Sequence, residues 1–173
     1  VVNVPVIARE LMGVDINAAG VYVVVPAGIG AIAGALTSSR LLKSGWRKKR
    51  TIESFFTLLT LALLLLLFLV PEVQSYRMVL GPAVVFLVGL SFVGIVIPSQ
   101  TFLQEVTPGG LRGRVFGNFW FLSTIATVFP VLFSGTVVEL LGIRFLIFIF
   151  AGLSLAGLVF SRKFGEAFLN KGL

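Results

Sequence analysis

Long stretches of the chain carry no charged residue, and this feature constrains the fold more than any other. Residues 54–70 are almost entirely apolar and contain the leucine-rich run 58–67. A helix needs about 20 mostly apolar residues to cross a hydrocarbon core about 30 Å thick. Only 12% of the 173 residues are charged, whereas soluble domains carry about 25%. The sequence therefore predicts a protein embedded in a membrane.

Five segments are long and apolar enough to be expected to cross the membrane. They lie at about residues 18–38, 54–70, 78–102, 115–138 and 145–160. Backbone polar groups in lipid must be satisfied within their own segment, so the spans are predicted to be α-helices. We interpret Val1–Ile7 as the stub of an earlier span. The expected fold is an all-α integral membrane protein, with residues 1–173 forming one transmembrane domain: a helical bundle of about five transmembrane helices plus the end of a sixth.

The basic residues are distributed unevenly over the segments that connect these spans. Eleven of the 14 fall in the loops 39–53 and 103–114 and in the tail 161–173. The other three are Arg9, Arg77 and Arg144. An excess of Lys and Arg marks the cytoplasmic side of a membrane protein. We therefore expect two cytoplasmic loops, a cytoplasmic C-terminus and a location in the cell (plasma or inner) membrane.

Six of these basic residues form a cluster between positions 40 and 50, which includes Arg40 and Arg47. We interpret the cluster as a determinant of topology. A binding site for anionic lipids is the alternative, because basic clusters beside a span attract such lipids. The net charge of +7 would also suit nucleic acid, but its placement beside the spans fits membrane topology better. We expect membrane lipids as partners and no nucleic acid.

The inventory of side chains excludes most catalytic chemistry. The chain has no His and no Cys, which removes the commonest general base and the commonest metal ligands. No Asp, Glu, Lys or Arg lies at the centre of a predicted span. We therefore expect no catalytic site, no metal and no cofactor. A membrane-embedded enzyme is the least favoured class of function.

The first span contains a stripe of small residues. Ala27, Ala31 and Ala35 recur every four positions beside Gly30 and Gly34. Such spacing lets two helix backbones approach closely. We expect these two glycines to lie on a helix-packing face.

The third and fourth spans carry most of the polar side chains. Pro82 and Pro98 are expected to interrupt the third span, because proline removes a backbone hydrogen bond. Polar groups at membrane depth commonly face the bundle interior or a substrate path. The candidates for a substrate cavity are Ser91, Pro98, Gln100, Thr101 and Asn118. Serine and threonine hydroxyls can instead bond to their own helix backbone.

Glu105 ends the third span on the predicted cytoplasmic side. Transporters driven by protons usually carry a carboxylate within the membrane, and Glu105 is the only local candidate. The simpler interpretation is an interfacial partner of Arg112 or Arg114. A proton is a candidate coupling ion, with its carrier expected elsewhere in a longer protein.

The stretch from Pro98 to Gly117 resembles the tenth helix, the following cytoplasmic loop and the start of the eleventh helix of major facilitator superfamily exporters. It carries a Gln-Glu pair, then Pro and an Arg-Gly-Arg triplet. Residues 34–50 are similar to the family's loop between helices eight and nine, although Ser39 stands where that loop has an aspartate. Residues 9–13 resemble the outer end of helix seven in multidrug and macrolide-type exporters.

This resemblance implies that the chain is the C-terminal half of such a fold, from the end of helix seven to helix twelve. In the family, helices seven and ten line the cavity, eight and eleven contact the other half, and nine and twelve lie outside. The implied function is secondary active export of a small-molecule substrate, a drug or metabolite, by alternating access. The missing N-terminal half would be a partner. The residues expected at the cytoplasmic gate or loop are Glu105, Arg112, Arg114, Arg40 and Arg47. A non-transporting membrane subunit or structural protein is the alternative.

Overall fold

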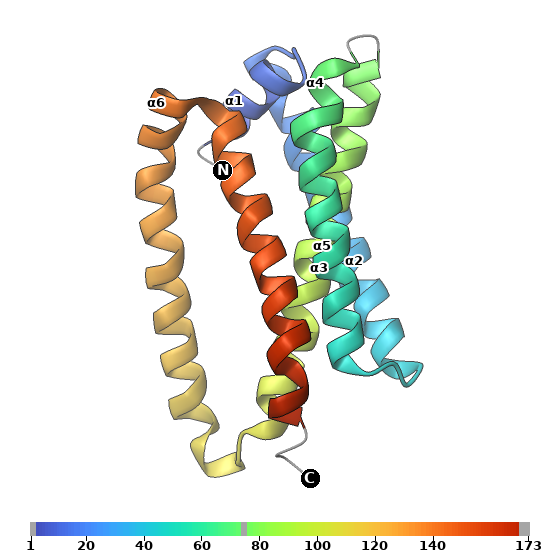
Figure 1. Ribbon diagram of the computed structural model, residues 1–173, viewed down its shortest axis with the longest axis vertical. Helices are drawn as coiled ribbons and strands as arrows, with labels where there is room; N and C mark the ends of the chain where they lie inside the picture. Colours follow the sequence, from blue (N-terminus) through green and yellow to red (C-terminus); the bar gives the residue numbers. More distant parts are fainter. Residues whose placement is uncertain (1–2, 74–75, 170–173) are drawn as a thin grey trace.

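The computed structural model describes residues 3–73 and 76–169, and within these ranges the chain is helical with no β-strand (Figure 1). The prediction of an all-α protein is confirmed. Four helical stretches in the described part of the chain are long and apolar enough to cross a membrane. They are Gly20–Lys43, Lys48–Glu72, Arg77–Val106 and Gly109–Lys163.

Each long stretch is built from one or more helical elements. The first consists of η3 (Gly20–Val24) and α2 (Val25–Lys43), and the second of α3 (Lys48–Leu64), η4 (Leu65–Leu69) and α4 (Val70–Glu72). The third is α5 (Arg77–Val106), and the fourth is η6 (Gly109–Leu111) followed by α6 (Arg112–Leu169). The apolar segments predicted from the sequence at 54–70 and 78–102 fall inside the second and third stretches.

A short N-terminal segment precedes these helices. It comprises α1 (Val4–Val6), η1 (Ile7–Leu11) and, after a turn, η2 (Ile16–Ala18). Gly13 in the turn has a φ of 67°, a conformation that glycine adopts without steric cost. Val4, Val6 and Ile7, in the segment interpreted as the stub of an earlier span, pack against the buried core, and the neighbouring Ala8 and Leu11 are fully buried.

The chain reverses direction inside α6. Gly142 has φ 80° and ψ 163°, which is not helical, and it divides α6 into a first arm, residues 112–141, and a second arm, residues 143–169. Figure 1 shows the two arms running in opposite directions. The spans predicted at 115–138 and 145–160 fall in one arm each.

α5 is one continuous helix from Arg77 to Val106, although it contains Pro82 and Pro98. The expectation that these prolines interrupt the span was therefore wrong. A proline costs a transmembrane helix little when neighbouring helices hold the backbone in place. Pro98 is fully buried, and α5 packs along both α2 and α3, which supplies that support.

The contact between α2 and α5 is the most extensive in the bundle, and glycines make it close. A Cβ atom built on Gly30 would overlap the carbonyl oxygen of Phe86, and one on Gly34 would overlap that of Leu90. A Cβ atom built on Gly89 of α5 would likewise overlap the carbonyl oxygen of Ala27 of α2. The two backbones therefore touch without side chains between them, on the face where the sequence placed Gly30 and Gly34.

The apolar core lies toward the end of the bundle that holds the N-terminal segment. Leu11 and Met12 from that segment, Val70 from α4 and Ile143 beside the turn in α6 are all almost completely buried. Met12 also occupies the space beside Gly81 of α5, where a Cβ would approach its Cγ to 2.8 Å. This end of the molecule is consequently the better packed one.

Candidate functional site

The polar residues predicted to line a cavity lie mainly on α5, but their hydroxyl groups bond to their own helix. Ser91 is fully buried, and its Oγ donates to the carbonyl oxygen of Leu87 at 2.7 Å. Thr101 is half-buried, and its Oγ1 donates to the carbonyl oxygen of Ile97 at 2.9 Å. Such bonds satisfy the hydroxyls inside the helix. Ser91 is thus enclosed by helix packing and does not face an open cavity in this structure.

The remaining cavity candidates are not gathered into one site. Gln100 is half-buried on α5, and Pro98 is buried beside it. Asn118 is exposed on the first arm of α6. Because α5 and α6 have almost no contact within the described residues, the structure does not bring Asn118 together with Gln100.

An ion pair joins α3 to α5 at the end of the bundle opposite the apolar core. The Nζ of Lys48, in the first turn of α3, contacts Oε2 of Glu105, in the last turn of α5. The prediction that Glu105 pairs with Arg112 or Arg114 was therefore wrong. Those arginines follow the end of α5 and a turn, whereas the start of α3 lies directly beside Glu105. Lys48 was missed because its partner is 57 positions away.

Arg112 has a different role at this end of the bundle. Its Nε donates to the carbonyl oxygen of Thr107 at 3.3 Å, just beyond the end of α5, so it stabilises the turn between α5 and α6. Arg114 is exposed. A shallow pocket of about 350 Å³ lies here, lined by Gln104, Arg112, Gly113 and Phe116.

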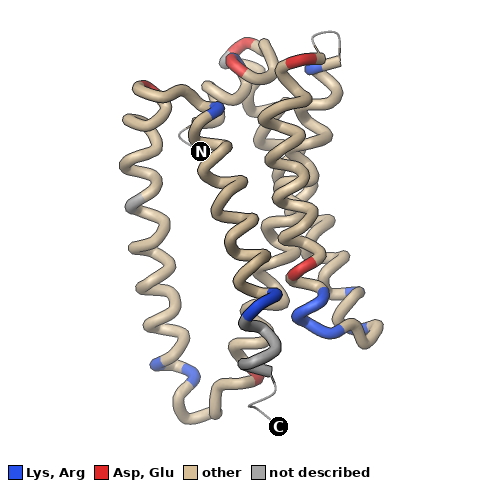
Figure 2. The backbone as a smooth tube through the Cα atoms, in the orientation of Figure 1, with Lys and Arg blue, Asp and Glu red and all other residues tan. Residues whose placement is uncertain are grey.

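Arg40 and Arg47, the other two candidates for a gate or loop, are exposed at the end of α2 and before α3. Figure 2 shows that Lys and Arg gather at this end of the molecule, most densely around the loop between α2 and α3. The opposite end carries most of the acidic residues in the picture and few basic ones. The charge asymmetry read from the sequence is thus also an asymmetry in space, although Lys171 lies outside the described residues.

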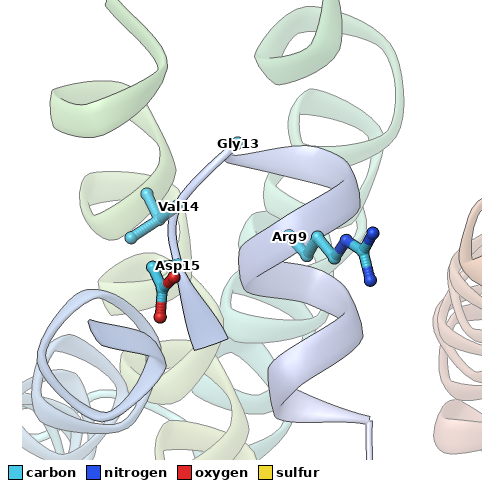
Figure 3. Close-up of a pocket in the computed structure, with 4 residues that line it drawn as sticks. All are labelled: Arg9, Gly13, Val14 and Asp15. Carbon is cyan, nitrogen blue, oxygen red and sulfur yellow. The ribbon is translucent and has the colours of Figure 1, made fainter. Parts of the chain in front are cut away.

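A second pocket, of about 440 Å³, opens at the opposite end (Figure 3). It is lined by Arg9, Gly13, Val14 and Asp15. The Arg9 side chain points away from Val14 and Asp15. Asp15 instead accepts a hydrogen bond at 2.8 Å from the backbone N–H of Asn17, so its carboxylate shapes the turn. No site residue was predicted here.

A polar contact between α3 and the second arm of α6 was also not predicted. The hydroxyl groups of Thr60 and Ser154 lie 2.9 Å apart, and both residues are buried. One turn away, Phe56 packs over Gly157, and the Oγ of Ser161 donates to Glu53 at 3.5 Å. The glycine and the two serines could have indicated a packing face, since small and hydroxyl residues are typical of helix interfaces in membranes.

Two apolar faces have no partner within the part of the chain that the structure describes. On η3 and α2, a stripe of five residues is at least 50% exposed: Val21, Val25, Ile29, Ile32 and Leu36. On the first arm of α6, the consecutive residues Trp120, Phe121 and Leu122 are all at least 59% exposed. Consecutive helical residues point in different directions, so that arm is exposed on most of its circumference.

Among the described side chains, no group of three or more Asp, Glu, His or Cys residues lies close enough together to hold a metal ion. Within the described residues, the arrangement offers a set of closely packed helices, two ion pairs at the basic end (Lys48–Glu105 and Lys49–Glu53) and two apolar faces without a partner.

Comparison with known proteins identifies the family. The model of the Major Facilitator Superfamily matches residues 1–131 of the 173. No curated protein and no solved structure matches the chain.

Proposed function

The chain belongs to the Major Facilitator Superfamily, a family of membrane transporters, and we propose that it forms the C-terminal half of an exporter. The exporter would be a secondary active one of the multidrug or macrolide type, moving small molecules out of the cell by alternating access. In this mechanism two helical halves rock against each other around a site near the middle of the membrane.

The close contact between α2 and α5 is the observation that carries this proposal. Gly30, Gly34 and Gly89 bring the two backbones together with no interlocking side chains. A smooth contact of this kind lets one helix move along another, which alternating access requires of the helices around its cavity. Interdigitated leucine side chains would oppose such movement.

The two apolar faces without a partner support the assignment to one half of a larger fold. In the order implied by the resemblance, α2 is helix eight and the first arm of α6 is helix eleven. These are the positions that contact the other half of the fold. The exposed stripe from Val21 to Leu36 and the exposed residues around Trp120 would be covered by the N-terminal half.

We assign the substrate-facing role to α5, the counterpart of helix ten. Gln100 and Thr101 would offer polar groups to the substrate from the half-buried side of α5, and Asn118 would offer its amide separately, from the first arm of α6. Ser91 and Pro98 would shape the helix from inside the bundle, since both are buried. The Lys48–Glu105 pair, with Arg112, would stabilise one state of the cytoplasmic side. A proton is the proposed coupling ion.

The experiment is a growth assay of the complete gene product in a bacterial host that lacks its own exporters, over a panel of antibiotics and dyes. We expect increased resistance to at least one compound. Gly34→Leu should abolish the resistance because the new side chain collides with Leu90 of α5, whereas Gly28→Leu, at a position with open space around it, should retain it. Resistance to no compound, or equal resistance in both variants, would argue against the proposal.

A further inference from the structure

The end of α2, the loop after it and the start of α3 carry a group of basic side chains that pair with no acidic side chain in the described part of the chain. We define the basic patch as Arg40, Lys43, Arg47 and Arg50. All four residues are exposed, and none forms an ion pair within the described residues. The patch lies in the region where Lys and Arg are densest in Figure 2, around the loop between α2 and α3.

The nearby carboxylates are engaged elsewhere. Glu105 pairs with Lys48. Glu53 lies 3.8 Å from the Nζ of Lys49 and accepts a hydrogen bond from Ser161. These are the acidic residues at this end among the side chains that the structure describes. The charge of the basic patch is therefore available to an external anion.

An aromatic residue lies within the basic patch. Trp46 is 45% exposed, and the guanidinium of Arg50 lies over its ring at 5.7 Å from the centroid. This cation–π contact holds the guanidinium in place, while its N–H groups can still bind phosphate oxygens as a fork. Tryptophan is enriched where a membrane meets water, at the level of the lipid headgroups.

The basic patch also lies where two candidate membrane-spanning stretches meet. Lys43 ends the first membrane-spanning stretch, and Lys48 begins the second. The patch thus flanks two spans directly, and we expect it to lie within about one Debye length, roughly 8–10 Å, of the membrane surface. We propose that Trp46 and the basic patch bind the phosphate groups of anionic phospholipids. This surface is separate from the α5 residues proposed to face the substrate.

The test uses the tryptophans of the chain, of which there are two. In a Trp120→Phe background, Trp46 becomes the sole reporter. The 173-residue chain is placed in phosphatidylcholine nanodiscs that contain either brominated phosphatidylglycerol or brominated phosphatidylcholine at the same mole fraction. Bromine quenches tryptophan at short range, so the ratio of the two quenching efficiencies reports enrichment of the anionic lipid beside Trp46.

We expect phosphatidylglycerol to be enriched, by about fivefold for each basic residue that contacts it. About 1 M NaCl, which shortens the Debye length to about 3 Å, should abolish most of the preference. Lys43→Gln with Arg47→Gln should lower the ratio toward one. Arg9→Gln with Arg144→Gln, a matched loss of two charges at the opposite end, should leave it unchanged.

Equal quenching by the two lipids in the Trp120→Phe chain would by itself overturn the proposal, whatever the patch variants show. A preference for phosphatidylglycerol that survives high salt would also overturn it. So would an Arg9 and Arg144 variant that loses the preference to the same extent as the patch variant. Circular dichroism of each variant shows whether the helices are intact.

Discussion

Lys48 and Glu105 form an ion pair that connects the first turn of α3 to the last turn of α5, at the basic end of the bundle. The side chain of Lys48 is 26% exposed and that of Glu105 60% exposed. An ion pair this accessible to water contributes only about 0–1 kcal/mol to stability. We propose that this pair, at the end of the helix assigned to face the substrate, acts in switching between states.

We predict that Glu105→Gln lowers transport by the complete protein while changing its melting temperature little. The charge swap Lys48→Glu with Glu105→Lys should restore transport, because it re-forms the ion pair in the opposite orientation. Efflux rates and thermal melting in detergent measure the two effects. If the swap is as inactive as the single variant, the pair does not act as a switch.

A second prediction concerns the contact between α2 and α5. Gly34→Ala places a methyl group against the carbonyl oxygen of Leu90, and overpacking of this kind costs about 1–3 kcal/mol. The variant should therefore unfold at a lower concentration of sodium dodecyl sulfate than the parent chain. Gly28→Ala on the same helix meets open space and should not destabilise it. Equal effects at the two positions would show that helix propensity, and not the contact, determines the result.

The hydrogen bond between Thr60 and Ser154 gives a third prediction. Ser154→Ala should destabilise the chain by about 0.6 kcal/mol, and by no more than about 1.7 kcal/mol, the range measured for such bonds between membrane helices. Adding Thr60→Ala should cost little more, since the bond is already lost. Thr57→Ala is the control, because Thr57 is exposed and donates only to its own helix. Strictly additive effects of the two substitutions would mean that the bond contributes nothing.

The orientation in the membrane can be tested by cysteine labelling, since the chain has no cysteine of its own. Ser44→Cys lies in the exposed loop between α2 and α3, and Asn17→Cys lies at an exposed position of η2 at the other end. With a maleimide that cannot cross membranes, intact cells should label position 17, and position 44 only after permeabilisation. The reverse pattern would refute the cytoplasmic assignment of the basic loops.

The apolar runs at 54–70 and 78–102 fall inside helical stretches of the structure, because the cost of burying charge in lipid keeps charged residues out of a span. The turn at Gly142 was also accessible from the sequence, as the boundary between two predicted spans. The partner of Glu105 could not be predicted from the sequence. Lys48 and Arg112 are both close to Glu105 in the topology, and only the packing of α3 on α5 decides between them. The continuity of α5 through Pro82 and Pro98 likewise depends on the helices around it.

The orientation of the candidate cavity residues could not be predicted from the sequence either. The sequence placed polar groups on the third span, but it could not determine that Ser91 faces α5's neighbours and bonds to Leu87. Nor could it determine that Asn118 lies on an arm with almost no contact to α5. Which face of a helix points inward depends on rotation about its axis, and neighbouring helices set that rotation.

Transport in inverted membrane vesicles is the decisive test of whether the chain is part of an exporter that works by alternating access. Vesicles containing the complete gene product, energised by a proton gradient, are incubated with the compound to which it gives the strongest resistance. We expect the vesicles to accumulate this compound, dissipation of the gradient to stop the accumulation, and Gly34→Leu vesicles to accumulate none. Accumulation equal to that of empty vesicles, or unchanged by Gly34→Leu, would contradict this function.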